Sequence, residues 1–480
     1  MKLSKFLQIL FGWIFFEVFF FFQQLSPAFA ANPANPNASV EVKKLYQYLI
    51  DLPDKPNKRV ISGQEVRVEK DAVIGYKEFV DVLYSGGNIS ESMFYGTGCG
   101  WENFAGTGKW VAMIGITYGP YSQGGTLENI VKANNEVLIP FWNYGGLITI
   151  HFNPDNPWTG SPRGGIGYSD LEELIDHERQ SEAYLRWRQF LDVYAAGLAH
   201  LQENGVIAII RPFAEMNYWD LNWWGAGAHE GEAEPFIALW KDMFDYFTYE
   251  KGLNNLLWVY GPANGGSVCK EVKIWENGGC VPIDHLYPGD NYVDIVGLSF
   301  YSNDQVMKEG RYEELIALNK PFAFSESGPD FKSDVVRCTP ASCNLWDNMK
   351  RIEAIKQRYP KTVYFLAWSS WWDWGTDPIT DICTAIVDTQ NPGQLLNDSW
   401  VITRGELSWQ SAQGPTPTRD PSSDDPVCFD YADTVINAGD ALLWSRNYGN
   451  YQGEIDAYTD SKINVFEFGY LLQNWGQRCI

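Results

Sequence analysis

Short apolar runs alternate with amphipathic segments through the middle of the chain. Eight of these runs have the composition of strands that are buried on both faces, as in a parallel sheet. They cover residues 60–64, 110–116, 146–152, 206–213, 255–260, 292–301, 321–326 and 362–368. The clearest helix candidates between them are residues 181–204 and 234–250, whose apolar positions follow helical spacing.

Eight strands that alternate with helices predict an α/β fold, a (β/α)8 TIM barrel with long loops. A doubly wound parallel sheet would show the same alternation. However, no glycine-rich phosphate loop follows the first strand candidate, which favours the barrel. In a barrel of this kind the functional residues lie at the carboxyl ends of the strands.

Two of the predicted strands lead directly into a carboxylate. Glu215 follows the fourth strand, shortly after Arg211, and Glu326 ends the seventh strand. An acidic loop over a core strand would explain Glu215 alone, but barrel closure brings both glutamates to one rim. Two carboxyl groups that flank a glycosidic bond act as acid/base and nucleophile when roughly 5–5.5 Å apart, with retention of anomeric configuration.

The sequence around the two glutamates suits these roles. Apolar and aromatic neighbours would keep Glu215 protonated, as a general acid requires. Glu326 would stay ionised through hydrogen bonds, and Tyr301, at the end of the sixth strand, is the expected donor. The segment after Glu215 is rich in tryptophan, and indole rings pack well against the faces of pyranose sugars.

Composition and charge agree with a carbohydrate substrate. The 21 Trp, 26 Tyr and 27 Phe make the chain 15% aromatic, and many of these residues lie in predicted loops. A formal charge of -24 argues against nucleic acid and against anionic membrane as partners, because both would repel the protein. A neutral polysaccharide is compatible with this charge.

At the fourth strand the sequence resembles glycoside hydrolase family 26. The segment Arg211-Pro-Phe-Ala-Glu-Met-Asn217, followed by Trp-Trp-Gly225, is similar to the family motif Arg-x-x-His-Glu-Met-Asn-Gly and Trp-Phe-Trp-Trp-Gly. Three further segments match the family: Ile61-Ser-Gly-Gln64, Asp155-Asn-Pro157 and Phe324-Ser-Glu-Ser-Gly328. The resemblance spans about residues 40–405 and is strong at these four places.

The family consists of retaining (β/α)8 enzymes, best known as endo-β-1,4-mannanases, with some β-glucanases and xylanases. The resemblance implies that Glu215 is the acid/base and Glu326 the nucleophile, in a monomeric catalytic domain that needs no cofactor. It also implies a set of substrate-binding residues, in which the three tryptophans stack on sugars and the tyrosine lies near the nucleophile: Asn153, Arg211, Asn217, Trp223, Trp224, Tyr301 and Trp368.

Two departures from the family pattern concern the substrate. Ala214 stands where the family has a histidine before the acid/base, and Phe152-Asn153 stands where the family has Trp-His. Alanine has no side-chain hydrogen bond to offer, and asparagine offers one without a charge. The leading hypothesis is a secreted endo-hydrolase of β-1,4-mannan. The alternatives are the same fold acting on β-glucan or xylan, and a catalytically silent carbohydrate-binding barrel.

Other polar positions leave their roles open. His151 alternates with apolar neighbours at the end of the third strand, where a structural role and a substrate-binding role are equally expected. Asp294 is expected at a strand end or at a helix cap. The aromatic cluster 371–374 could line the sugar-binding side or pack on itself. No His-Glu-x-x-His pairing indicates a catalytic metal.

The first 30 residues have the features of a secretory signal peptide. Lys2 and Lys5 precede an apolar stretch, and Ala28-Phe29-Ala30 provides small residues for cleavage. Glu17 within the apolar stretch leaves an uncleaved anchor as the alternative. All eight cysteines follow residue 30, and an even number in an exported chain favours disulfides. Proximity in sequence suggests Cys269–Cys280, Cys338–Cys343 and Cys428–Cys479, which leaves Cys99–Cys383 by elimination.

A second domain is predicted after the hydrolase domain, which spans residues 31–408. Residues 409–426 form a polar, proline-rich linker, and residues 427–480 contain a repeat with an offset of 27 residues. The second copy resembles an EF-hand calcium loop, and the pair resembles a dockerin module that binds a cohesin-like or cell-surface receptor. The alternative is a small calcium-stabilised module without a partner. The expected calcium ligands are Asp456, Asp460, Lys462 (through its backbone), Asn464 and Glu467.

Overall fold

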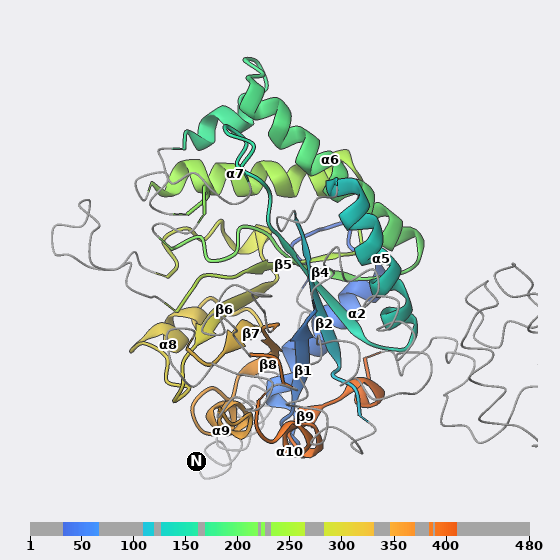
Figure 1. The fold of residues 1–480 in the computed structure, drawn as a ribbon, viewed down its shortest axis with the longest axis vertical. Coiled ribbons are helices and arrows are strands. Elements are labelled where there is room, and N and C mark those ends of the chain that lie inside the picture. Colours follow the sequence, from blue (N-terminus) through green and yellow to red (C-terminus); the bar gives the residue numbers. More distant parts are fainter. Residues whose placement is uncertain are drawn as a thin grey trace, which may run out of the picture.

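A closed barrel of eight parallel strands forms the centre of the protein, as predicted (Figure 1). The computed structural model describes residues 32–66, 109–119, 126–161, 169–218, 222–225, 232–264, 283–330, 346–369, 384–386 and 389–409. The predicted signal peptide, all eight cysteines, the aromatic cluster 371–374 and the predicted calcium loop lie outside these residues.

Each barrel strand overlaps one of the predicted apolar runs. The strands are β1 (Val60–Glu65), β2 (Met113–Tyr118), β3 (Leu147–Phe152), β4 (Ala208–Arg211), β5 (Leu256–Tyr260), β6 (Ile295–Tyr301), β7 (Phe322–Gly328) and β8 (Thr362–Ala367). They pair in chain order, and β1 pairs with both β8 and β2, which closes the barrel. A further short strand, β9 (Val401–Ile402), pairs with the start of β1.

Helices lie outside the strands (Figure 1). They are α2 (Val40–Asp51), α5 (Leu127–Asn143), α6 (Glu182–Glu203), α7 (Ala233–Asp245), α8 (Arg311–Ile316), α9 (Met349–Gln357) and α10 (Pro392–Asn397). Helix α6 starts where predicted, because the Ser181 side chain accepts a hydrogen bond from the backbone N–H of Tyr184. None of the helices within the described ranges is long and apolar enough to cross a membrane.

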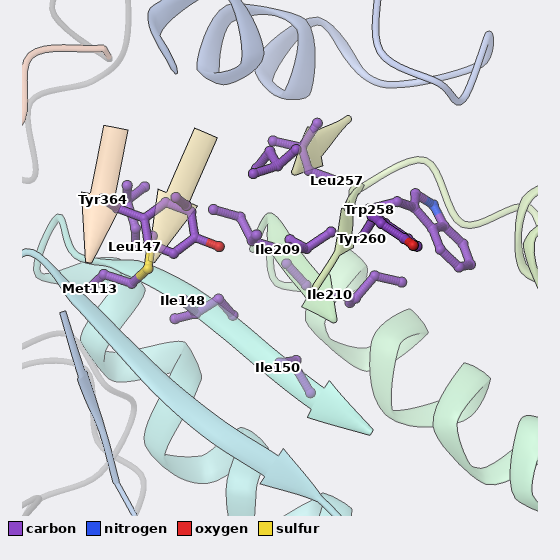
Figure 2. Packing of buried hydrophobic residues seen from close by; sticks show 14 of the residues in the cluster. Met113, Leu147, Ile148, Ile150, Ile209, Ile210, Leu257, Trp258, Tyr260 and Tyr364 are labelled. Carbon is purple, nitrogen blue, oxygen red and sulfur yellow. The ribbon is translucent and has the colours of Figure 1, made fainter. Parts of the chain in front are cut away.

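The strands bury nearly all of their residues, which explains their continuous apolar character. Figure 2 shows part of the core that β2 to β5 and β8 contribute, including Met113, Ile148, Ile209, Leu257 and Tyr364. Because neighbouring strands are fixed by this packing, the residues at their carboxyl ends are held at defined positions around one rim.

The segment before β1 packs against the amino-terminal ends of the strands. Asp294, just before β6, is fully buried and accepts hydrogen bonds from the backbone N–H groups of Ala34 (2.6 Å) and Trp258 (2.8 Å). Its position at a strand end agrees with the prediction. Burial raises the pKa of Asp294 to about 6, because the charged form loses its contact with water.

Candidate active site

A pocket opens at the carboxyl ends of the strands, and both predicted catalytic glutamates line it. It contains about 310 Å³ of space, part of it open to solvent. Glu215 comes from the loop after β4, and Glu326 comes from β7. The rest of the lining comes from the end of β3 (His151, Phe152, Asn153), the loop after β4 (Ala214, Asn222, Trp224) and the end of β8 (Trp368).

An irregularity in β7 directs Glu326 into this pocket. Between Phe324 and Ser327, β7 has one residue more than the paired stretch of β8. The register with β6 shifts over the same part of β7. A β-bulge of this kind changes the direction of a side chain and is common beside active sites. The bulge explains how Glu326 can face the pocket although it lies within a barrel strand.

Arg211 and Tyr301 hold the two oxygens of the Glu326 carboxylate. Arg211 Nη1 donates to Glu326 Oε2 at 2.5 Å, and the Tyr301 hydroxyl donates to Oε1, as predicted. Arg211 Nη2 donates to Ser299 Oγ. Arg211 is 1% exposed. We therefore correct its predicted role in substrate binding: it holds the carboxylate.

The charges of these groups stabilise one another. Burial alone would lower the pKa of Arg211, but the carboxylates of Glu326 and Glu215 outweigh burial, so that the pKa is raised. Burial and the Glu326 carboxylate raise the pKa of Tyr301 well above its usual value. Arg211 therefore remains a cation and Tyr301 a hydrogen-bond donor throughout the physiological pH range.

A glycine after β5 leaves room for Arg211. A Cβ atom at Gly261 would lie 2.5 Å from Arg211 Nε, closer than any ordinary contact. The guanidinium cannot move away without losing its bonds to Glu326 and Ser299. The residue at position 261 is thus part of what places the carboxylate, although it has no side chain.

The loop after β4 holds Glu215 in an uncommon backbone conformation. Phe213 and Glu215 have φ angles of 48° and 57°. Such angles cost a residue other than glycine about 1–3 kcal/mol and often occur at functional sites. Backbone hydrogen bonds hold the loop: the Glu215 N–H donates to the Gly261 carbonyl at 2.9 Å, and the Glu215 carbonyl accepts from Tyr218 at 2.8 Å.

The three tryptophans predicted to stack on sugars occupy different environments. Trp368 lines the pocket at the end of β8. Trp224 also borders the pocket but is only 1% exposed. Trp223 is fully buried, so its predicted contact with a sugar is wrong. Its ring packs edge-on against Trp187, and its indole N–H donates to the Pro154 carbonyl at 3.2 Å, which supports the pocket wall from behind.

The two predicted asparagines also differ. Asn153 lines the pocket, next to the end of β3. Asn217 is held by the backbone of Ala263: its Nδ2 donates to the Ala263 carbonyl at 2.9 Å, and its Oδ1 accepts from the Ala263 N–H at 2.7 Å. Its predicted substrate contact is therefore replaced by a structural one, which fastens the Glu215 loop to the segment after β5.

Two pocket residues were not assigned from the sequence. His151 lies two positions before Asn153, and this spacing places both on the same side of the chain. That alternation is the signal that could have identified it. Asn222 lies in an irregular tryptophan-rich loop, where spacing carries no information about side-chain direction.

No group of three or more His, Cys, Asp or Glu side chains that could hold a metal ion occurs in the part of the chain that the structure describes. The predicted calcium ligands of residues 456–467 lie outside that part.

The profile of glycosyl hydrolase family 26 matches residues 34–406. The mannan endo-1,4-beta-mannosidase A and B of Caldalkalibacillus mannanilyticus is 34% identical over 417 residues, which cover 84% of this chain and 68% of that protein. The mannan endo-1,4-beta-mannosidase of Bacillus subtilis is 30% identical over 389 residues, which cover 79% of this chain and 90% of that protein.

A similar fold is found in a solved Bacillus subtilis mannanase. Its structure superimposes with a TM-score of 0.59 at 27% sequence identity. The superposition covers 81% of this chain and 99% of the mannanase chain.

Proposed function

The chain belongs to glycosyl hydrolase family 26, and from this premise we propose that it hydrolyses β-1,4-mannan at internal bonds. It is a retaining glycoside hydrolase, and enzymes of this family need no cofactor for catalysis. The proposal for the substrate rests on the similar proteins from two bacterial species, both of which are mannan endo-1,4-beta-mannosidases.

In the first step, Glu326 attacks the anomeric carbon while Glu215 protonates the glycosidic oxygen. The bond to the leaving sugar breaks, and a covalent glycosyl-enzyme forms on Glu326. In the second step, Glu215 removes a proton from water, which attacks the same carbon and releases Glu326. Two inversions give net retention at the anomeric carbon.

One observation carries this assignment of roles. Both oxygens of Glu326 accept hydrogen bonds, one from a guanidinium and one from a hydroxyl. Donors of this kind hold a carboxylate in one direction, as a nucleophile requires. Glu215 lies in the same pocket, bordered by Ala214 and Trp224.

A second candidate substrate follows from Ala214. The residue lines the pocket immediately before Glu215 and offers no side-chain hydrogen bond. The sugar-binding side of the pocket therefore differs from the family pattern, which has histidine there. β-Glucan or xylan is the alternative substrate on this ground.

The test is the release of reducing sugar by the full chain from mannan, glucomannan, mixed-linkage β-glucan and xylan. We expect release from the mannans, and a loss of at least about 10³-fold in both Glu326→Ala and Glu215→Ala. The exposed Glu203→Ala is the matched control and should keep full activity. Release from glucan or xylan alone would refute the mannan proposal but leave the two glutamates in place.

Azide distinguishes the two roles. It can replace the missing nucleophile in Glu326→Ala and give a glycosyl azide of inverted configuration. In Glu215→Ala it can attack the glycosyl-enzyme and give a glycosyl azide of retained configuration. The opposite pattern would exchange the two assignments.

We further propose that the chain is exported and that residues 427–480 bind calcium and a cohesin-like or cell-surface receptor. The support is the sequence pattern: a signal peptide in residues 1–30, a linker in residues 409–426 and an EF-hand-like loop. Calorimetric titration of the full chain with Ca²⁺ tests the module. One site that is lost in Asp456→Ala is expected, whereas equal binding by both proteins would refute it.

A further inference from the structure

Helix α7 lies outside the barrel, beside α6, and a π-helical turn, η4 (Tyr246–Glu250), follows it (Figure 1). The Lys251 N–H donates to the Tyr246 carbonyl at 2.9 Å, which closes this wider turn. Turns of this kind are rare in proteins and frequently occur at functional sites. Tyr249 on η4 is 58% exposed, and it is the only aromatic residue among the strongly exposed large apolar side chains of the described ranges. The turn therefore presents an aromatic ring to solvent.

Two charged residues of α7 lie on the same side of the helix as Tyr249. Lys241, Asp245 and Tyr249 follow one another at intervals of four residues. This spacing places helical side chains one above the other. A π-helical turn is slightly wider than an α-helical turn, so η4 keeps Tyr249 close to the line of the other two.

Tyr292 adds a second ring to this row. It ends a short helix just before β6, and its ring centroid lies 5.1 Å from Lys241 Nζ. The ring packs edge-on against Phe244 of α7, with ring centroids 5.1 Å apart. Burial, Asp245 and Tyr249 all raise the pKa of Tyr292, which agrees with their proximity and keeps its hydroxyl protonated. These four residues form what we call the α7 strip: Lys241, Asp245, Tyr249 and Tyr292.

The α7 strip lies at the opposite end of the barrel from the pocket. Tyr249 comes shortly before β5 and Tyr292 shortly before β6, so both lie at the amino-terminal ends of the strands. The pocket opens at the carboxyl ends, where Glu215 and Glu326 line it. A ligand on the α7 strip therefore does not reach the two glutamates.

The chemistry of the α7 strip fits a neutral sugar chain. Tyrosine offers an apolar ring face, on which a pyranose can pack, and a hydroxyl for hydrogen bonds. Lys241 can donate to sugar hydroxyls and Asp245 can accept from them. The two charges cancel locally, and the overall charge of -24 repels polyanions. Two rings of about 150–250 Å² each are far smaller than the roughly 1,200–2,000 Å² of a stable protein interface, which disfavours a protein partner.

We propose that the α7 strip binds the polysaccharide substrate outside the pocket and holds the enzyme on long or insoluble polymer. The inference rests on the proposed function for the identity of that polymer. Binding at a second site raises the effective concentration of polymer at the pocket. It leaves the hydrolysis of short oligosaccharides unchanged, because these do not extend from one end of the barrel to the other.

Tyr249→Ala tests the α7 strip, because an exposed ring can be removed with little effect on folding. Depletion of the full chain from solution by insoluble mannan, on ice, measures binding. We expect about fivefold weaker binding in Tyr249→Ala and recovery in Tyr249→Trp, which restores a ring. In both variants kcat/KM on soluble manno-oligosaccharides should equal that of the wild type. Val40→Ala is the control, since Val40 is apolar and 60% exposed but lies outside the strip. It should bind mannan as the wild type does.

Three results would overturn the inference. The first is equal binding to the polymer by the wild type and Tyr249→Ala. The second is an equal loss on oligosaccharides and polymer, which would show an effect on the pocket. The third is a wild-type dimer in analytical ultracentrifugation that is absent in Tyr249→Ala, which would assign the strip to a protein interface. If the wild type cleaves glucan or xylan instead of mannan, the proposed substrate is refuted, and the binding assay with that polymer still tests the strip.

Discussion

The pair formed by Arg211 and Glu326 is buried on both sides, with side chains 2% and 10% exposed. Removing two ions from water costs several kcal/mol each, and their attraction offsets this cost only when further hydrogen bonds hold them. Tyr301 and Ser299 provide these bonds. The pair therefore places a negative charge in the pocket and contributes little net stability.

Replacing one member of the pair should be costly. In Arg211→Met, Glu326 remains buried without its cation, and we expect a loss of about 3–5 kcal/mol in the free energy of unfolding together with loss of activity. Urea denaturation and a reducing-sugar assay measure the two effects. Lys361→Met is the control, because the exposed pair Lys361–Asp54 should contribute less than about 1 kcal/mol. Equal losses in both variants would contradict this account.

Sequence reasoning succeeded for some residues of the site and failed for others. Glu326 and Tyr301 could be paired from the sequence, because both end adjacent strands of a predicted parallel barrel. Trp223 and Asn217 could not be assigned correctly, because sequence does not show whether a side chain faces the pocket or packs behind it. His151 remained undecided, because a single histidine at a strand end occurs in the core as well as in a pocket.

At the level of strands and loops, the contact between Gly261 and Arg211 can be tested. In Gly261→Ala the new methyl group would meet a guanidinium that has no room to move. We expect a loss of about 1–3 kcal/mol in stability and a clear fall in kcat, because Glu326 is displaced. Gly405→Ala is the control, since nothing lies within 4 Å of its added Cβ. Full activity in Gly261→Ala would refute the role of this glycine.

The burial of Asp294, just before β6, makes the free energy of unfolding depend on pH. The pKa of Asp294 is about 6 in the folded protein, above its usual value of 3.8. The folded state therefore binds this proton more tightly than the unfolded state. Stability falls as pH rises from about 4 to 6, by roughly 3 kcal/mol at about 1.36 kcal/mol per pKa unit. Above pH 6 the full cost is present.

Asp294→Asn should remove this dependence. Relative to the wild type, the variant is expected to gain about 3 kcal/mol in the free energy of unfolding between pH 4 and pH 7. Urea denaturation at several pH values measures the difference. The exposed Asp170→Asn is the control, and its curve should run parallel to that of the wild type. A parallel curve for Asp294→Asn would contradict the prediction.

Elements were predicted well where long apolar runs mark them. All eight barrel strands were found from such runs, although β2 begins at Met113, three residues after the predicted start. Trp110 instead packs against the guanidinium of Arg404. The short strand β9 was not predicted, because two residues carry no periodicity and their pairing depends on the start of β1, which is distant in the sequence.

At the scale of the whole molecule, the contacts of residues 401–409 indicate how far toward the carboxyl terminus the chain contributes to the stability of the barrel. Residues 401–409 add β9 and place Trp409 against Trp142, with ring centroids 5.5 Å apart. A chain that ends at residue 409 should keep its activity. A chain that ends at residue 399 loses these contacts, at about 2 kcal/mol for each buried side chain, and should melt at a lower temperature. Equal melting temperatures for the two would refute this boundary.

The described part of the chain ends at the opposite side of the barrel from the pocket. Residues 401–402 pair with the first residues of β1, and Trp409 contacts the carboxyl end of α5. Glu215 and Glu326 lie at the far ends of the strands. A group attached directly after residue 409 would therefore join the barrel at the end opposite the pocket. When the protein is fixed to a solid support by its carboxyl terminus, the mouth of the pocket faces away and stays open to long polymers. Fixation through the loops around the mouth would block it.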